Sequence, residues 1–389
     1  MRIFVLLSRV PYPLEKGDKL RAFNQIKELA KKNELILCAL NPNKNLDKQK
    51  AFSKLQPYCH SINFLDLPVH LRFWNMAVAF FDNIPIQAGY FYNKKAAKEI
   101  RRLISTYKPD HIYCQFIRTA EYVKNINIKK TLDYQDVLSH GIKRRIKKAS
   151  LFTLPFFKIE YKRLLVYERE VFDYFDNKTI ISVPDKDLIP HKNKEEIHVI
   201  PNGVDHSYFK PINKEKTFDV LFTGNMAYPP NVDAAEYLIK EIMPTVWKKI
   251  PNTRVLLAGA SPAKKVKSLQ SKQVKVTGWM DDIRDAYSSA RIFIAPMCIG
   301  TGLQNKLLEA MSMKIPSITT PLANDALQAK EGSEILIGTT SSELANQIIE
   351  LLKNENFYNT VAENGYNFVH NSYSWKNATE KLNEIINNS

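Results

Sequence analysis

Two side chains suited to binding a phosphorylated ligand lie on one stripe of a short helical run in the second half of the chain. Gly300 and Gly302 precede this run, and Lys306 and Glu309 follow at spacings that share one helix face. Glycines allow close backbone approach at a helix start, where free N–H groups and the helix dipole favour a phosphate. Glu309 follows Gly302 by seven residues, so it lies roughly 10 Å from Gly302 along the helix axis. This is about the separation of a diphosphate from a ribose. A carboxylate at that place can accept hydrogen bonds from two ribose hydroxyls.

The elements around these residues predict how they are positioned. Residues 291–297 read as a buried strand, 303–314 as a helix and 315–320 as a second strand. Leu307 and Met311 belong to an apolar stripe on the other side of the helix, which would pack on the sheet. Glycine loops also precede helices in many α/β proteins, and a single surface glutamate is usually solvated. A purely structural interpretation therefore stays open for this stretch taken alone.

A second group of candidate residues lies near the N-terminus, at the start of a predicted helix from Lys19 to about Lys31. Residues 2–8 read as a buried strand, and Gly17 would let the backbone after it approach a ligand. Lys19 and Arg21 place positive charge at the N-terminal end of this helix. The alternative is an ordinary solvated, basic helix start.

Three stretches of this sequence together resemble one enzyme family. The run PMCIGTGLQNKLLEAMSMKIPSIT at 296–319 resembles the donor-site segment of the family 4 retaining glycosyltransferases. HVIPNGVDHSYFKP at 198–211 resembles the connection that precedes their second domain. The opening SRVPYPLEKGDKLRAFNQIKELA is similar to a bacterial sugar-transferase subgroup of the same family.

The resemblance implies the B-type glycosyltransferase fold, in which two Rossmann-like, doubly wound α/β domains face a cleft. We expect residues 1–205 to form the acceptor-side domain, with 371–389 returning to it, and 206–370 to form the domain that binds the nucleotide sugar. The chain of 389 residues suits two domains of roughly 200 residues. Alternating strand-like and helix-like runs in both halves predict parallel sheets.

The sequence departs from the family in the residues that contact the donor. Family members usually carry two glutamates in the donor segment; Glu309 matches the second, and Thr301 occupies the position of the first. We expect the Thr301 hydroxyl and the neighbouring backbone amides, including those of Gly302 and Leu303, to take over its role.

The cations that usually neutralise the departing diphosphate are also absent. Gly224 and Asn225 stand where members carry a Gly-Arg pair, and Met226 to Asn231 lack the usual lysine. Lys306, Lys19 and Arg21 are the predicted substitutes. The family reads the nucleotide base near the position of Gly278 and Trp279, so Trp279 is a candidate for stacking on the base, with a core or surface tryptophan as the alternative.

Acidic and imidazole side chains follow a strand of the first half. The family has an acidic residue or a histidine of this domain near the reacting centre, which makes Asp133, Asp136 and His140 the catalytic candidates beside Lys306. Aspartates after a strand often only cap a turn, so the structural alternative applies to them as well. No metal site and no cofactor are expected, because cations and helix amides can stabilise the leaving group.

The net charge of +16 limits the classes of binding partner to be considered. No groove-reading helix, zinc module or aromatic RNA platform is present in the sequence, so nucleic acid is not an expected partner. Basic residues lie beside bulky apolar residues in the segment from Lys143 to Phe157, a composition that suits an anionic membrane surface. A plain charged helix face is the alternative. No run of residues approaches the roughly 18 apolar residues of a membrane span. We expect a cytoplasmic protein, peripheral on the inner membrane face.

These features predict an enzyme that transfers a sugar from a nucleotide diphosphate sugar to a glycan or lipid-linked saccharide in bacterial cell-surface polysaccharide synthesis. Two alternatives remain open: a nucleotide-sugar epimerase or hydrolase on the same architecture, and a non-catalytic nucleotide-sugar-binding subunit.

Overall fold

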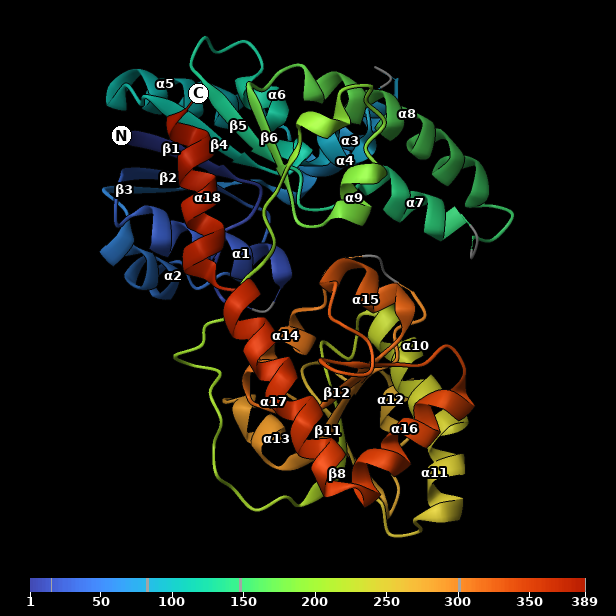
Figure 1. Ribbon diagram of the computed structural model, residues 1–389. Coiled ribbons are helices and arrows are strands. Elements are labelled where there is room, and N and C mark those ends of the chain that lie inside the picture. Colours follow the sequence, from blue (N-terminus) through green and yellow to red (C-terminus); the bar gives the residue numbers. More distant parts are fainter. Residues whose placement is uncertain (15, 82–83, 147–148, 300–301, 389) are drawn as a thin grey trace. The chain divides into compact units, whose positions relative to one another are not determined.

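The structure is a computed structural model that describes residues 1–14, 16–81, 84–146, 149–299 and 302–388. The chain divides into two compact units, each with its own sheet (Figure 1). Unit 1 is Met1–Pro201 with Lys376–Ser389, and unit 2 is Asn202–Trp375. The sequence prediction placed these two boundaries at 205/206 and 370/371, within a few residues of the observed ones.

Unit 1 is built on a seven-stranded sheet in the order β3-β2-β1-β4-β5-β6-β7, with every pairing parallel. Its strands are β1 (Arg2–Leu7), β2 (Glu34–Asn41), β3 (Ser61–Asp66), β4 (His111–Gln115), β5 (Lys130–Asp133), β6 (Asn177–Ile180) and β7 (His198–Val199). Its longer helices are α1 (Gly17–Leu29), α2 (Lys48–Leu55), α3 (Val69–Phe81), α4 (Ile86–Phe91), α5 (Lys94–Tyr107), α7 (Leu138–Ile146), α8 (Leu154–Phe172) and α18 (Trp375–Asn387). Two short helices, α6 (Ala120–Val123) and α9 (Val183–Asp187), complete it.

Helices cover both faces of this sheet, because successive side chains of each strand point to opposite faces and both faces are apolar. Ile3 and Val5 of β1 pack with α1, α2 and α18, whereas Phe4 and Leu6 pack with α4, α5 and α8. The C-terminal helix α18 belongs to the first layer through Leu382. Tyrosine, leucine and isoleucine side chains fill these two layers, so the sheet is buried on both sides, as a parallel sheet requires.

Unit 2 contains a six-stranded, all-parallel sheet in the order β10-β9-β8-β11-β12-β13. Its strands are β8 (Phe218–Thr223), β9 (Val255–Ala258), β10 (Val274–Val276), β11 (Ala290–Ala295), β12 (Ser317–Thr319) and β13 (Leu336–Ile337). Its helices are α10 (Pro229–Tyr237), α11 (Met243–Lys249), α12 (Lys264–Lys267), α13 (Arg284–Ser288), α14 (Asn305–Ser312), α15 (Pro321–Leu327), α16 (Ser341–Lys353) and α17 (Glu355–Ser372).

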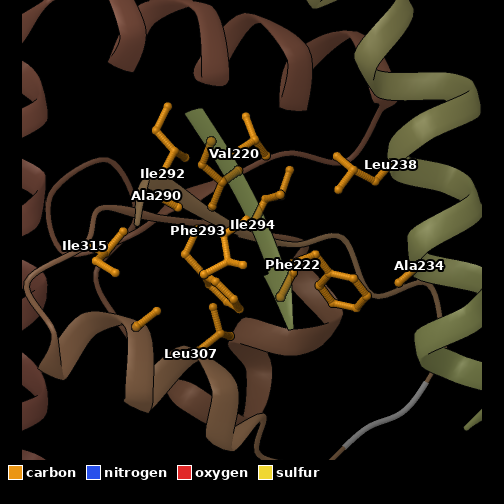
Figure 2. Packing of buried hydrophobic residues seen from close by; sticks show 14 of the residues in the cluster. Val220, Phe222, Ala234, Leu238, Ala290, Ile292, Phe293, Ile294, Leu307 and Ile315 are labelled. Atoms are coloured by element: carbon orange, nitrogen blue, oxygen red, sulfur yellow. The ribbon is translucent and has the colours of Figure 1, made fainter. Parts of the chain in front are cut away.

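The core of unit 2 is organised around β8 and β11. Figure 2 shows Val220 and Phe222 of β8 beside Phe293 of β11, with Leu307 of α14 packed from one side and Leu238 from another. All of these side chains are fully buried. The packing of Leu307 fixes the rotation of α14 about its axis. The direction in which Lys306 and Glu309 point is therefore determined by the core.

The structure confirms the prediction of two Rossmann-like, doubly wound α/β units. Strand order in unit 2 reverses between β8 and β11, the first and fourth strands in sequence. Ligands of such sheets bind outside the carboxyl ends of the strands at this reversal point. The carboxyl ends of β8 and β11 are therefore where a site is expected on structural grounds.

None of the helices in the described ranges combines the length and apolar composition that a membrane crossing needs.

Candidate functional site

The glycine-rich segment leads into α14, which begins at Asn305, two residues later than the sequence predicted. Gly302 and Leu303 therefore lie in the segment before its first turn. A methyl group added at Gly302 would meet no atom within 4 Å, which leaves room for a ligand close to the backbone. The predicted donor contacts Gly300 and Thr301 lie outside the described residues and stay predictions.

Lys306 lies in the first turn of α14 with its ammonium group turned into a half-buried site. Its Nζ is 2.6 Å from Oδ1 of Asn231 and 4.7 Å from the centre of the Phe222 ring. Burial lowers the pKa of Lys306 to about 7, because the site removes water from the charged form. Asn231 in turn donates its amide N–H to the carbonyl oxygen of Asn225 at 2.9 Å. The turn after β8 is thereby joined to α14.

Gly224 makes this arrangement possible at the end of β8. Its φ of +154° lies in a region that side chains disfavour, and a Cβ would stand 2.7 Å from Nδ2 of Asn231 and 3.2 Å from Nζ of Lys306. Any larger residue would therefore displace the Lys306–Asn231 pair. Gly224 and Asn225 are predicted donor contacts; the structure places Gly224 beside Lys306 and joins Asn225 to Lys306 through Asn231. Nothing in the sequence pointed to Asn231, which lies in the part of the turn where family members usually carry a lysine.

Glu309 lies one turn after Lys306 on the same stripe of α14. Tyr287, fully buried on α13, donates its hydroxyl proton to Oε2 of Glu309 at 2.7 Å. The same hydroxyl lies 2.9 Å from Oγ1 of Thr223, the last residue of β8. Burial raises the pKa of Glu309 to about 7, and the Tyr287 hydrogen bond opposes that rise. Tyr287 was not singled out in the sequence, because nothing local shows which tyrosine will meet the helix stripe.

These contacts gather a cation and a carboxylate at the carboxyl end of β8, beside the reversal of strand order. Lys306 has a neutral hydrogen-bond partner in Asn231, so its closest partner leaves its charge available. Glu309 is held in one orientation by Tyr287. The arrangement can bind an anion at Lys306 and hydroxyl donors at Glu309, one helical turn away.

Trp279 and Gly278 follow β10, which is separated from β8 by β9. The Trp279 side chain is 64% exposed, and its indole N–H donates to Oδ1 of Asp281 at 3.2 Å. The exposed ring excludes the alternative of a core tryptophan. Base stacking by Trp279 stays a prediction.

Arg21 and Asp133 form a buried ion pair with each other. Nε of Arg21 lies 2.7 Å from Oδ2 of Asp133, and both side chains have 0% exposure. Asp133 also accepts hydrogen bonds from the hydroxyls of Tyr113 and Thr179. These two side chains therefore offer no surface to a ligand. The structure corrects the prediction that Arg21 contacts the diphosphate and that Asp133 is catalytic: the pair is part of the interior of unit 1.

Lys19 and Gly17 lie at the start of α1, which begins at Gly17. Lys19 is half-buried and lines a hollow at the carboxyl ends of β1 and β4, together with Ser8, Arg9, Asp18 and Gln115. Arg9 pairs with Asp18 at 2.8 Å. Phe116, which closes the hollow, has a φ of +63°, a backbone conformation that costs about 1 to 3 kcal/mol and is concentrated at functional sites. Diphosphate contacts of Gly17 and Lys19 stay predictions.

Asp136 and His140 lie after β5, beside and within α7. Asp136 is exposed and His140 is half-buried. Glu168, which the sequence did not mark, is buried nearby and accepts the backbone N–H of Ser139 at 3.0 Å. Burial raises the pKa of Glu168 to about 7. The two sequence candidates are thus close to the carboxyl end of the first sheet, and their catalytic role stays a prediction.

Within the described ranges, histidine, cysteine and carboxylate side chains form no group of three that could hold a metal ion.

The sequence comparisons point to one family. Residues 217–354 match the family described as Glycosyl transferases group 1. The chain is also 24% identical over 396 aligned positions to an uncharacterised 44.6 kDa protein in the cps region of Klebsiella pneumoniae, covering 96% of this chain and 97% of the relative.

Solved structures share the fold of the whole chain. Sucrose-phosphate synthase from Thermosynechococcus elongatus matches with a TM-score of 0.72 at 14% identity, covering 99% of this chain and 98% of that one. HepE from Anabaena, solved with UDP-glucose, matches with a TM-score of 0.70 at 12% identity and covers 100% of both chains. Residues 217–354 of unit 2 therefore match the group 1 glycosyltransferases in sequence, and the chain as a whole has the two-domain B-type glycosyltransferase fold.

Proposed function

We propose that the protein is a retaining glycosyltransferase that moves a sugar from a nucleotide diphosphate sugar to a hydroxyl of a glycan or lipid-linked saccharide. The observation that carries this proposal is the pairing of Lys306 and Glu309 on one stripe of α14, at the carboxyl end of β8. Lys306 would contact the diphosphate and Glu309 the ribose. HepE has been solved with UDP-glucose, which supports UDP sugars as the first donors to test.

The reaction needs a stable leaving group above all. The bond between the anomeric carbon and the diphosphate oxygen breaks, and a bond from the acceptor oxygen to the same carbon forms. Lys306 and the amides leading into α14 would bind the developing diphosphate charge, a role that needs no metal. Retention of configuration, with attack from the leaving-group face, is proposed from the family resemblance. In that geometry the departing diphosphate oxygen takes the acceptor proton, and Asp136 or His140 of unit 1 would contact the reacting sugar or the acceptor.

A role in bacterial cell-surface polysaccharide synthesis is supported by the Klebsiella relative, which is described as lying in a cps region. An acceptor carried on a lipid would place the enzyme at the inner face of the cytoplasmic membrane. We include this location in the proposal.

A two-step assay tests the proposal. Thermal shift with a panel of nucleotide sugars first identifies the donor, since a ligand that binds the folded state raises Tm. Release of nucleoside diphosphate is then measured with and without candidate acceptors, and the anomeric configuration of the product is read by NMR. Release that depends on acceptor, with a retained configuration, supports the proposal. Release without acceptor would indicate a hydrolase, conversion of the donor sugar an epimerase, and binding without turnover a non-catalytic subunit.

A further inference from the structure

The positive charge of this protein is concentrated in unit 1. Unit 1 carries 38 lysines and arginines against 23 aspartates and glutamates, whereas unit 2 carries 18 against 17. Unit 1 therefore has a net charge of +15 and unit 2 of +1. The donor site described above lies in unit 2, so the excess charge of unit 1 is not explained by binding a nucleotide sugar there.

Helix α3 of unit 1 has its polar and apolar faces reversed. Arg72 is buried, with 8% exposure, while Phe73 is 64% and Trp74 is 69% exposed. Val78, one turn after Trp74, is also exposed. A helix on the surface of a soluble domain normally directs its large apolar side chains inward. The outward face of α3 is therefore adapted to an apolar environment outside the protein.

The contacts on the inner face of α3 fix this orientation. The Arg72 guanidinium donates to the Tyr90 hydroxyl, and Nδ2 of Asn75 donates to the carbonyl oxygen of Tyr92 at 2.5 Å. A Cβ added to Gly89 of α4 would overlap Cβ of Ala79, so the two helices are in close contact. A rotation of α3 that buried Phe73 and Trp74 would break all three contacts.

A second exposed apolar group lies between α7 and α8. Leu151 is 86% and Phe152 is 91% exposed. Phe157, which the sequence grouped with them, instead packs against the core of unit 1. Four basic residues of this region are exposed as well: Lys143, Arg145, Lys158 and Lys162. Between residues 138 and 166 the sequence has one acidic residue, Glu160, which is buried.

Helix α8 connects the two apolar groups. The Glu160 carboxylate accepts the backbone N–H groups of Ile86 and Gln87 at the start of α4, at 2.8 and 3.1 Å. One turn later, Arg163 reaches the carbonyl oxygen of Ala79 near the end of α3 at 3.5 Å. The helices α3, α4 and α8 are thus one packed assembly (Figure 1).

We propose that the outward faces of α3 and of the α7–α8 region form a membrane-binding surface that inserts shallowly into anionic lipid bilayers. Exposed lysines and arginines would contact lipid headgroups, and Phe73, Trp74, Leu151 and Phe152 would enter the boundary between headgroups and acyl chains. This inference deepens the proposed location at the membrane. It does not depend on the transfer reaction, because its test measures lipid binding.

The charge of unit 1 favours a bilayer over other binding partners of this surface. Two copies of this surface would bring two units of +15 together, which repulsion opposes. A soluble acidic polymer would match the charge and leave the aromatic side chains in water. An anionic bilayer provides both the negative charge and the apolar layer.

Co-sedimentation of the full chain with vesicles tests the surface. The protein should pellet with phosphatidylcholine vesicles that contain phosphatidylglycerol, much less with phosphatidylcholine alone, and less as salt increases. Replacing Lys143, Arg145, Lys158 and Lys162 by Gln should lower the partition coefficient about a hundredfold or more, since each cation near the surface contributes about fivefold. The matched control replaces Lys94, Lys95, Lys98 and Arg101, which are exposed on α5, and removes the same charge. It should lower binding far less.

The apolar contribution has its own test. Quenching of Trp74 fluorescence by brominated lipids should be seen in the parent and disappear in W74F, which keeps an apolar side chain but removes the reporter. The double variant F73S/W74S should lose most of its binding, while F52S, a change at an exposed phenylalanine of α2, should not. Thermal stabilisation by the donor should be the same in all these variants. Equal pelleting with neutral and anionic vesicles, equal effects of the two sets of charge substitutions, or a stable dimer that buries Trp74 would overturn the proposal.

Discussion

Lys306 donates a hydrogen bond of 2.6 Å to the side-chain oxygen of Asn231. The partner is an uncharged amide, which can orient the ammonium group without neutralising it. Glu309 is one turn further along α14, and its carboxylate is occupied by the Tyr287 hydroxyl. The site thus holds a cation in place for an incoming anion while the nearest carboxylate is oriented by a different residue. This relationship makes Lys306 the strongest candidate for binding the diphosphate.

The first prediction concerns this cation directly. Lys306→Met should weaken nucleotide-sugar binding by about 1.5 to 3 kcal/mol, the range for a charge-assisted hydrogen bond. Asn231→Asp should also weaken it, because the new carboxylate would compete with the diphosphate for Lys306. Isothermal titration calorimetry measures both. Lys314→Met, at an exposed lysine just after α14, is the control and should bind normally. If Lys306→Met binds the donor as tightly as the parent, the diphosphate lies elsewhere.

The second prediction is that Glu309 anchors the ribose of the donor. Glu309→Gln should lower donor affinity by a similar amount, about 1.5 to 3 kcal/mol, because an amide replaces a charged acceptor. Glu350→Gln, on the exposed side of α16, is the matched control and should change nothing. The result to compare is the affinity for the nucleotide sugar against that for the corresponding sugar phosphate, which has no ribose. A loss that is equal for both ligands would contradict the assignment.

The third prediction is a maximum in donor affinity near neutral pH. Burial lowers the pKa of Lys306 to about 7 and raises that of Glu309 to about 7. The diphosphate needs protonated Lys306, so affinity should fall as pH rises above that value. The ribose hydroxyls need ionised Glu309, so affinity should also fall as pH decreases below it.

A pH series of donor titrations checks both limbs of this curve. The ligand should be the nucleotide sugar, because the terminal phosphate of a free nucleoside diphosphate titrates in the same range. Lys306→Met should remove the alkaline limb and Glu309→Gln the acidic one. A flat profile in the parent protein, or limbs that persist in both variants, would show that other groups control the binding.

The sequence predicted the fold and one part of the site for identifiable reasons. Strand and helix periodicities are local, and the helix stripe that carries Lys306 and Glu309 follows from spacing alone. Contacts between distant parts of the chain are not local. Tyr287 reaches Glu309 from another helix, and the sequence around Tyr287 does not predict this contact. The same limit explains the wrong predictions for Arg21 and Asp133, since their spacing of 112 residues hides the fact that they satisfy each other.

The fourth prediction follows from the burial of that ion pair. Both charged groups have 0% exposure, so removing one partner leaves the other charge without compensation in the interior. Arg21→Met and Asp133→Asn should each destabilise unit 1 by about 3 to 5 kcal/mol. The double variant should be more stable than the sum of the two losses predicts, because no charge is then left unpaired. Tyr113 and Thr179 donate to different oxygens of Asp133, so the single amide oxygen of Asp133→Asn keeps only one of these two hydrogen bonds, and the loss of the other adds to the destabilisation.

Urea unfolding followed by circular dichroism gives the free energies of unfolding for these variants. The partly exposed pair Arg9–Asp18 is the comparison, and Arg9→Met should cost about 1 kcal/mol or less, because water already screens that pair. Donor affinity should be unchanged in every variant that remains folded, since the buried pair offers no surface to a ligand. If Arg21→Met instead keeps full stability and loses donor binding, Arg21 is a ligand contact and the structural role assigned to the pair is wrong.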